Sequence, residues 1–537
     1  MTGGTEQGPS RGGNRGQFRN LAYPRSSSAY RSWGGGMLFP TPEFAFLFLP
    51  AAVLLHFTLA RWSIGAAILG TTISSLFFYA WWNPPLVVIP VLSILANFQL
   101  AAWMQSAQPA QSRRLLIFGV IANLLVLGYF KYADFLLSIL DGHVPKPPEV
   151  PLALSFTTFV QIAFLTYVHQ RRTRVAFDRY ALFVAFFPHL IAGPIVRWGS
   201  FGNQISDPQR YRVDWSNFAL GLTIFVFGMG KKVIIADSLS PHVDLLYAAV
   251  GRGEPVTTLA AWASCVAFSM QVYFDFSGYS DMAVGLGLLF NYRLPVNFAA
   301  PLRATSMSDL WRRWHITLAR LCRDLIYVPL AKNSGELRRR FSLWFTMVAI
   351  GVWHGAGWTF VLWGASQGFM LLINQEWRRW RGPGRPSAIG RVFGWALTFA
   401  SFAATAPLFR GPNLTTATNL FAAMAGFGNA PIAERHFEVD DWMIRHGYLS
   451  DLFVRTWFGS TWSMVAMIST FVVLLVVIVV PDTMEITGYR DGDAQSEWRR
   501  QLPAWQPSLA ALVVTAAIFV VAFTKIGQVS EFVYFQF

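Results

Sequence analysis

The chain has 537 residues, of which 54% are hydrophobic, 16% aromatic and 13% charged, and its mean hydropathy is +0.39. This composition excludes an ordinary soluble globular domain and indicates a membrane protein. The net charge of +15 would suggest a nucleic-acid partner in a soluble protein. Here the basic residues lie in short connections such as RRTR (171–174), as the positive-inside bias of membrane proteins predicts, so no nucleic acid is expected. The two cysteines lack metal-ligand spacing, and no metal site is expected.

Apolar runs that are long enough to cross a bilayer recur through nearly the whole chain. They lie at 44–60, 64–82, 86–104, 115–130, 151–168, 216–236, 257–274, 341–353, 358–375, 390–408, 463–480 and 506–524. The runs lack the period-two alternation of a membrane barrel, so each pass must satisfy its backbone as a helix. The predicted fold is an all-α, polytopic helical membrane protein with about ten to twelve passes, some of them re-entrant.

The N-terminal residues 1–36 are rich in Gly, Ser and Arg and lack an apolar core. We therefore expect a disordered basic extension. The segment has no apolar h-region of the kind found in cleavable signal peptides, so the first spanning helix is expected to act as an uncleaved signal. Met37 opens the sequence MLFPTPEFAFLFLP and is an alternative start position.

The stretch FFPHLIAGPIVRWGSF (186–201) cannot form one regular helix, because it contains Pro188, Gly193 and Pro194. Broken backbone at membrane depth must line a cavity or be buried in protein. That arrangement would place Arg197 beside freed backbone groups. A surface turn between two helices is the alternative.

The stretch YFDFSGYSDMAVGLG (273–287) follows an apolar run and places Asp275 and Asp281 among serine and tyrosine side chains. Ionisable groups are costly inside a membrane and are therefore candidates for function. The density of hydrogen-bonding groups suits a polar pocket or a water-filled entry. An interfacial turn with a tyrosine belt is the alternative.

The stretch SDLWRRWHITLARLCRDLIYVPL (308–330), drawn as one continuous helix, separates an apolar arc from a charged face. The charged face holds Arg312, Arg313, Arg320, Arg323 and Asp324. A helix of this kind lies in the membrane interface or the protein interior, where its guanidinium groups can bind lipid phosphates or a phosphorylated cofactor. His315 falls on the edge of the apolar arc, either as a packing residue or as a functional group.

The stretch AIGVWHGAGWTFVLWGASQG (349–368) carries no formal charge and one histidine, His354. Two G-x-x-x-G pairs, which allow backbones to approach closely, are Gly351 with Gly355 and Gly364 with Gly368. Desolvation disfavours the charged imidazole, so we expect a neutral ring that can accept a proton as a general base. A hydrogen bond that joins two helices is the alternative.

Two polar stretches interrupt the later apolar runs, at 410–462 and at about 482–505, and each is expected to form a small aqueous cap. No internal repeat and no inverted pair of broken helices is visible, which weakens a transporter interpretation without removing it. Residues 463–537 are expected to form C-terminal helices that end in FVYFQF.

Six stretches carry a resemblance to a known family. In chain order they are PLALSFTTFVQI, FFPHLIAGPIVRW, GMGKKVIIAD, VYFDFSGYSDMAVGLG, DLWRRWHITLARLCRDLIYVPL and GVWHGAGWTFVLWG. Together they resemble the membrane-bound O-acyltransferase (MBOAT) family, in the branch of the alginate O-acetyltransferase membrane subunit and the teichoic-acid D-alanyl transferase subunit. The resemblance runs from about Met37 onward and implies a catalytic core at 37–409 that surrounds a central tunnel with spanning, re-entrant and interfacial helices.

The resemblance also implies the site residues. His354 in GVWHGAGW looks like the family's catalytic histidine, and His315 in WRRWHITL looks like the second active-site position of the branch. The candidate residues for binding the acyl donor, in supporting roles, are Arg197, Arg312, Arg313 and Asp324.

The C-terminal residues fit the pattern F-x-Y-x-x-F with Phe532, Tyr534 and Phe537. This ending resembles that of a small partner in the D-alanyl system, whose tyrosine is implicated as a covalent acyl carrier. By this resemblance Tyr534 is a third catalytic candidate, acylated with His354 as base. An aromatic anchor at the membrane interface is the alternative.

The activity that the resemblance implies is transfer of an acetyl or other short acyl group from cytoplasmic acetyl-CoA towards hydroxyls of an exported polysaccharide. The implied location is the cytoplasmic (inner) membrane of a bacterium. A hydrolase-like partner outside the cytoplasm is expected to complete the transfer, because the chain shows no strand-to-helix nucleophile elbow: its G-x-S-x-G match, GASQG (364–368), lies within the apolar run 358–375. Acylation of a lipid or protein hydroxyl and, in another class, a transporter or channel are the alternatives.

Overall fold

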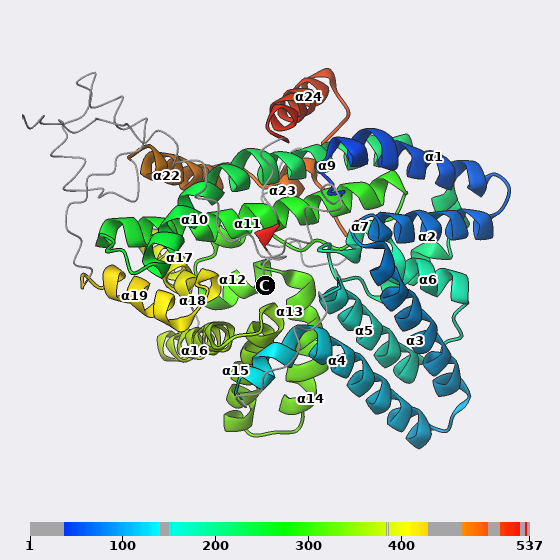
Figure 1. The fold of residues 1–537 in the computed structure, drawn as a ribbon, viewed down its shortest axis with the longest axis horizontal. Coiled ribbons are helices and arrows are strands. Elements are labelled where there is room, and N and C mark those ends of the chain that lie inside the picture. Colours follow the sequence, from blue (N-terminus) through cyan, green and yellow to red (C-terminus); the bar gives the residue numbers. More distant parts are fainter. Residues whose placement is uncertain are drawn as a thin grey trace, which may run out of the picture.

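The computed structural model describes residues 37–139, 150–151, 153–382, 384, 386–427, 464–491, 505–526 and 532–533. Every regular element in these ranges is a helix (Figure 1), which confirms the all-α prediction. The predicted extension at 1–36, most of the predicted cap at 410–462 and Tyr534 lie outside the described residues.

The first part of the chain forms a set of helices that ends in the long central helix α11. In order they are the π-helical turn η3 (Glu43–Phe48), α1 (Leu49–Ala60), α2 (Ile64–Ala80), η4 (Pro84–Val87), α3 (Val88–Ser106), α4 (Pro109–Ile139), α5 (Leu154–Arg171), α6 (Phe177–Ala185), α7 (Phe187–Leu190), α8 (Trp198–Ile205), η5 (Pro208–Tyr211), α9 (Trp215–Met229), the π-helical η6 (Gly230–Ala236), α10 (Asp237–Gly251) and α11 (Thr258–Leu289).

The second part begins with short, interrupted helices and continues with longer ones. In order they are η7 (Pro301–Arg303), α12 (Met307–Arg313), α13 (Ile316–Cys322), the π-helical η8 (Arg323–Tyr327), α14 (Val328–Ala331), α15 (Glu336–His354), α16 (Trp358–Arg381), α17 (Ala388–Ala404), α18 (Ala406–Arg410), α19 (Leu414–Met424), α22 (Met464–Val479), α23 (Thr483–Thr487) and α24 (Leu509–Thr524).

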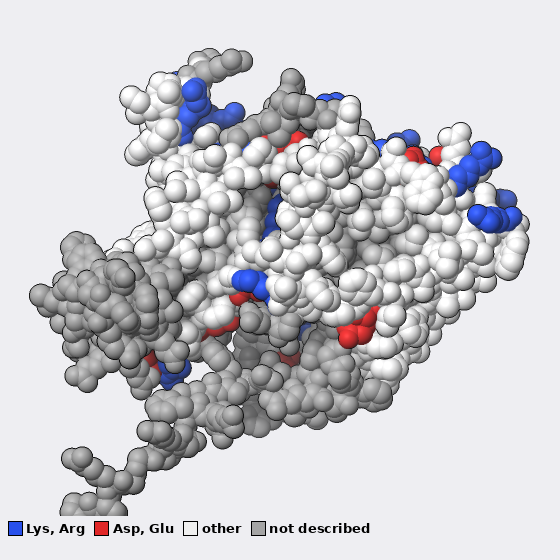
Figure 2. Space-filling model, turned by 90° about the horizontal axis from the view of Figure 1, so that it is seen from above, with Lys and Arg blue, Asp and Glu red and all other residues white. Residues whose placement is uncertain are grey.

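Within the described residues, 6 helices are long and apolar enough to cross a membrane, which supports the predicted multi-pass protein. They are Glu43–Ala60, Pro84–Ser106, Pro109–Leu137, Trp215–Gly251, Ala388–Arg410 and Ile468–Thr487, and shorter apolar helices lie at Ile64–Ala80 and Leu509–Thr524. Figure 2 shows that uncharged residues form most of one face of the molecule, with charged side chains in small separate groups. Such a surface is suited to hydrocarbon.

The centre of the fold is α11, which runs through the middle of the molecule with α9 packed along it (Figure 1). Glycines set this close approach, because a Cβ on Gly228 would lie 2.5 Å from the carbonyl oxygen of Gly278, and one on Gly285 would lie 2.5 Å from that of Gly221. Every residue from 267 to 289 of α11 is buried. The helix therefore supplies side chains to the interior in all directions.

Helices α15 and α16 form a second closely packed pair, a helical hairpin. A Cβ on Gly364 would lie 2.5 Å from the carbonyl oxygen of Met347, and one on Gly351 would clash with the carbonyl oxygen of Phe360. The close approach that the G-x-x-x-G pattern predicts is thus present at this hairpin. It places the C-terminal end of α15 against the start of α16.

Candidate active site

His354 is the last residue of α15, and the chain turns away at Gly355 to begin α16. Its side chain is buried, with 4% of the residue exposed. The imidazole lies edge-on to three aromatic rings, whose centroids are 4.9 Å away for Trp353, 5.3 Å for Trp363 and 5.2 Å for Phe409. The histidine that the sequence singles out therefore lies in the interior, among aromatic side chains from three helices.

The helix end that carries His354 is held by side chains of α4. The Lys131 ammonium donates to the carbonyl oxygens of Trp353 at 2.6 Å and of His354 at 3.1 Å, and the Tyr132 hydroxyl donates to that of Val352 at 2.8 Å. The last carbonyls of a helix have no partner within the helix and carry the negative end of its dipole. A cation at this point both satisfies them and fixes the backbone of His354.

The predicted continuous helix over 308–330 is wrong, because the chain breaks at Trp314 and His315 between α12 and α13. His315 adopts a left-handed backbone conformation, with φ 42° and ψ 54°. This conformation is costly for a residue with a side chain and persists only where the surroundings impose it. The break turns the imidazole inward, and only 1% of His315 is exposed.

Asn297 imposes the break and orients His315. Its backbone oxygen accepts the N–H of Ile316 at 2.9 Å, and its Oδ1 accepts both the N–H and the hydroxyl of Thr317, at 3.3 and 2.9 Å. The same Oδ1 lies 3.0 Å from Nδ1 of His315. Because a backbone N–H can only donate, the shared atom is an acceptor, and Nδ1 of His315 must carry the proton. The lone pair of the neutral ring is then on Nε2, for which the described residues supply no hydrogen-bond partner.

The two histidines flank one tryptophan. The ring centroid of Trp353 lies 4.9 Å from that of His354 and 6.1 Å from that of His315. From the other side, Phe276 of α11 packs edge-on against His315 at 4.7 Å. The fold thus brings together two of the three residues that the sequence analysis assigned to catalysis, although 38 residues lie between them in the chain.

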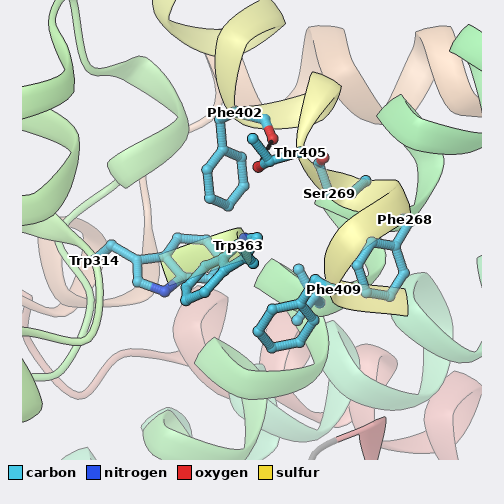
Figure 3. A pocket seen from close by; sticks show the side chains of 9 residues that line it. Phe268, Ser269, Trp314, Trp363, Phe402, Thr405 and Phe409 are labelled. Atoms are coloured by element: carbon cyan, nitrogen blue, oxygen red, sulfur yellow. Dashed lines mark hydrogen bonds between the residues drawn. The ribbon is translucent and has the colours of Figure 1, made fainter. Parts of the chain in front are cut away.

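A small cavity, shown in Figure 3, lies near His354, which is not itself one of its lining residues. Its volume is about 20 Å³, and its lining residues come from α11, α16, α17, α18 and the break before α13: Phe268, Ser269, Val272, Trp314, Trp363, Phe402, Thr405, Ala406 and Phe409. Trp363 and Phe409 are also ring neighbours of His354. The cavity and the imidazole therefore share two walls.

The stretch 273–287 is not the interfacial turn that was one of its two interpretations, because it lies in the interior of α11. Its carboxylates form buried ion pairs with the lysines of GMGKK. Asp281 lies 2.6 Å from Lys231, and Asp275 lies 2.7 Å from Lys232. Lys232 also lies 2.7 Å from Asp237. Sequence analysis missed this role of the lysines, although two cations and two carboxylates in apolar segments must find opposite charges.

A larger cavity, of about 240 Å³, lies between η6 and α11 on one side and the C-terminal helices α22, α23 and α24 on the other. Its wall is mostly aliphatic and includes Lys231 and Tyr273 on one side and Asp482 on the other. Of the stretch 273–287, only Tyr273 and Phe274 border this mostly apolar cavity, so the polar pocket of the other interpretation is not formed by Asp275 and Asp281. This cavity shares no lining residue with the one beside His354.

Two residues near the C-terminus lie in the interior. The N–H of Val533 donates to Asp275 at 2.8 Å, and the ring of Phe532 packs on Tyr279 and Phe276, with centroids 5.0 and 5.7 Å apart. Phe276 is the residue that contacts His315. The tail segment at 532–533 is therefore one aromatic ring away from the site.

The stretch 186–201 is broken, as predicted, with α7 followed by irregular backbone up to α8. Residues 186–196 are all buried, so the alternative of a surface turn is wrong for this part. The N–H of Ile195 donates to the Thr317 hydroxyl at 3.0 Å, which ties the stretch to the break at His315. Arg197 lies at the edge, with 45% of its side chain exposed, and pairs with Asp324 at 2.8 Å.

The four residues that the sequence analysis assigned to donor binding fall into two groups. Arg313 and Arg312 are within 3.0 and 3.4 Å of Asp309 in α12. Arg197 and Asp324 form the separate pair already described. No group of three His, Cys, Asp or Glu side chains that could hold a metal occurs among the described residues.

These features define a class. The molecule is a multi-pass helical membrane protein whose interior holds two imidazoles around a tryptophan, close to a small apolar cavity. Residues 73–406 match the model of MBOAT, the membrane-bound O-acyltransferase family. The chain belongs to this family and is an O-acyltransferase, so the resemblance drawn from the six motifs is confirmed.

Several relatives match more than half of the chain. It is 36% identical over 448 residues to the peptidoglycan O-acetyltransferase of Helicobacter pylori, which covers 76% of this chain and 84% of that protein. It is 37% identical over 413 residues to a protein of Azotobacter vinelandii named "Probable alginate O-acetylase AlgI", covering 74% of this chain and 80% of that one. The teichoic acid D-alanyltransferase of Bacillus subtilis is more distant, at 23% identity over 307 residues, covering 55% and 76%.

Proposed function

We propose that the protein transfers an acetyl group from acetyl-CoA on the cytoplasmic side of a bacterial inner membrane towards hydroxyls of an exported polysaccharide. The names of two relatives, a peptidoglycan O-acetyltransferase and a probable alginate O-acetylase, support the acceptor class. The observation that carries the proposal is the pair of buried imidazoles around Trp353, with a small apolar cavity beside one of them.

His354 acts as the general base in this proposal. It takes the proton of the attacking hydroxyl, whose oxygen forms a bond to the thioester carbonyl carbon. The carbon–sulfur bond then breaks, and the proton passes from His354 to the CoA thiolate. The base must hold its position relative to the reacting atoms, and the contacts of Lys131 with the end of α15 provide that support.

His315 has a different part in the proposal. Since Asn297 holds the proton on Nδ1, Nε2 offers a lone pair to the site. It can accept a hydrogen bond from a non-reacting N–H or O–H group of the donor or the acceptor, and thereby orient that molecule.

Tyr534 is the proposed intermediate carrier of the acyl group. Two observations favour a tail that serves the site: Asp275 binds the backbone of Val533, and Phe532 packs on Phe276. In this step the tyrosine hydroxyl attacks the thioester, and the phenyl ester then passes its acyl group to the next hydroxyl. A hydrolase-like partner outside the cytoplasm is proposed to complete transfer to the polymer, and Arg197, Arg312, Arg313 and Asp324 remain candidates for binding the donor.

The test uses membranes that contain the full chain, supplied with acetyl-CoA labelled in the acetyl group. We expect His354→Ala to lower label transfer by about 10²- to 10⁴-fold, the usual worth of a general base, with normal expression and folding. His56→Asn is the matched control, because His56 is equally buried and hydrogen-bonded to Thr71 in another part of the bundle. Undiminished transfer by His354→Ala would refute the role of the base.

The same membranes test the donor and the carrier. A requirement for long-chain acyl-CoA would contradict the acetyl assignment, and solute flux that survives His354→Ala would favour a transporter. Peptide mass spectrometry of enzyme trapped during turnover should find the acyl group on Tyr534. Unmodified Tyr534, or full activity of Tyr534→Phe, would rule out the carrier while leaving the transferase assignment intact.

A further inference from the structure

The cavity near His354 is lined mostly by large aromatic side chains. In Figure 3 the rings of Phe402, Trp363 and Phe409 surround the space, with Trp314 and Phe268 completing the aromatic wall. A volume of about 20 Å³ is enough for one water-sized group and not for a chain of several carbons. The protein therefore leaves a defined but very small space next to its base.

The polar atoms of the wall do not suit the cavity to water. The Ser269 hydroxyl donates to the carbonyl oxygen of Cys265 at 2.8 Å, and the Thr405 hydroxyl donates to that of Phe402 at 2.8 Å. The Thr405 oxygen also accepts from Gln367 at 2.9 Å. An ordered water needs two to four polar partners. With both hydroxyl protons already bound within the protein, the wall is better suited to an apolar group.

The cavity adjoins the chemistry, because Trp363 and Phe409 form one side of it and lie 5.3 and 5.2 Å from the imidazole of His354. His354 does not line the cavity itself, so an acyl group that reacts at the imidazole would extend its alkyl end, past these two rings, into this space. Packing voids are few in protein interiors and their walls lose contacts, so a void at the base calls for an occupant.

We propose that this cavity is the acyl pocket: it receives the methyl of the transferred acetyl group, and Phe402 is the residue that limits the length of the acyl chain. This inference rests on the proposed function and adds to it a limit on the length of the acyl chain. Phe402 comes from α17 and packs on Trp314, with ring centroids 5.1 Å apart. Extra methylenes would have to displace this pair, and an overfilled site is penalised sharply.

The test is the donor chain-length profile of the full-length protein in membranes, with acetyl-, propionyl- and butyryl-CoA. For the wild type we expect a rate at least tenfold lower with butyryl-CoA than with acetyl-CoA. Phe402→Ala and the milder Phe402→Leu should raise the butyryl-to-acetyl ratio by tenfold or more. A ratio that both variants leave unchanged, in folded protein, would overturn the assignment.

Phe399→Ala is the matched control. Phe399 is also a phenylalanine of α17 and is also 7% exposed, but it stacks on Trp395 and does not line the cavity. It should carry a comparable folding penalty without changing the ratio. Ala406→Val makes the opposite test, because it fills the pocket: acetyl transfer should fall about tenfold while the thermal melting temperature is kept.

Failure of this inference and failure of the proposed function give different results. Wild-type protein that transfers no acyl group from any of the three donors would contradict the proposed function. Wild-type protein that uses all three at similar rates would leave the function standing and refute the acyl pocket. An increase in the butyryl ratio with Phe399→Ala equal to that with Phe402→Ala would also refute it, because the effect would then be general loosening of α17.

Discussion

Two buried polar regions meet at α11, and they differ in how their polar side chains are stabilised. On one side, full charges lie in the interior as ion pairs, Lys231 with Asp281 and Lys232 with Asp275. On the other side, His315 is held by the neutral amide of Asn297, and His354 lies among aromatic rings. The first region is built from charge compensation and the second from hydrogen-bond orientation and packing.

The difference shows what each region can do. A buried ion pair has a cost of desolvation that only its partner offsets, so it holds helices in place and is a poor source of reactivity. A neutral imidazole can take up a proton, provided that its tautomer and position are fixed. In this protein the ion pairs join η6 to α11, while the imidazoles line the site that α11 borders.

The largest effect should come from breaking an ion pair. Lys231→Met leaves the carboxylate of Asp281 buried without its cation, and we expect a loss of about 3 to 5 kcal/mol in the free energy of unfolding. The double variant Lys231→Met/Asp281→Asn should recover most of this loss, because it removes both charges. Unfolding curves in detergent measure both values. A double variant no more stable than the single one would mean that the pair does not act by charge compensation.

The next effect concerns the tautomer of His315. Asn297→Asp replaces the amide by a carboxylate, which stabilises the imidazolium at 3.0 Å. If the neutral ring is needed, the acid limb of the pH–rate profile should move to higher pH, by about one to three units. The rate at alkaline pH should be retained. A profile that does not move would show that His315 takes no part in its neutral form.

A smaller effect is expected at the end of α15. Lys131→Met removes the hydrogen bonds to the carbonyls of Trp353 and His354, worth about 1.5 kcal/mol, and acyl transfer should fall roughly tenfold. Tyr132→Phe, which removes a bond to the same helix end, is the control and should leave the rate within a factor of about two. Lys131→Arg should restore activity in part. Equal losses in Lys131→Met and Tyr132→Phe would point to general stability instead of positioning.

The smallest effect on stability is expected at the partly exposed ion pair of Asp324 with Arg197. Burial opposes ionisation of Asp324, but hydrogen bonds from Arg323 and Arg197 outweigh it and hold the pKa below its usual value of 3.8. The pair therefore stabilises the fold above that value and loses its effect as the pH falls through the lowered pKa. Because the groups are partly exposed, Asp324→Asn should cost under about 1 kcal/mol.

Thermal melting at a series of pH values checks this last prediction. The difference between wild type and Asp324→Asn should be constant from neutral pH down to about pH 4 and should shrink below it. A difference that grows on acidification would contradict the sign of the pKa shift.

The helical fold could be predicted from the sequence because lipid leaves the backbone few choices. Helix packing at the glycines of 349–368 was predictable for a similar reason, since only a missing side chain allows backbones so close. The burial of His354 followed from the uncharged stretch around it. These features depend on the local composition of the sequence, because the residues that determine them lie within a few helical turns of one another.

The break at His315 could not be predicted in this way. The stretch 308–330 has the periodicity of one helix, and the residue that interrupts it, Asn297, lies outside the stretch. The contacts of Lys131 and Val533 are likewise made with residues that are 222 and 258 positions away in the chain. Tertiary partners of this kind leave no periodic signal, although a lone lysine beside an apolar run was a sign that one existed.

The contact between Asp275 and Val533 has a consequence for biogenesis. The two residues are 258 positions apart, and Lys232 is translated before either of them. While the ribosome makes the intervening chain, Lys232 is the partner that can already neutralise Asp275 in the nascent bundle. The contact of Val533 can form only after this long stretch has been made, and a chain released before residue 533 would lack the backbone donor to Asp275 while retaining the residues of the ion pair.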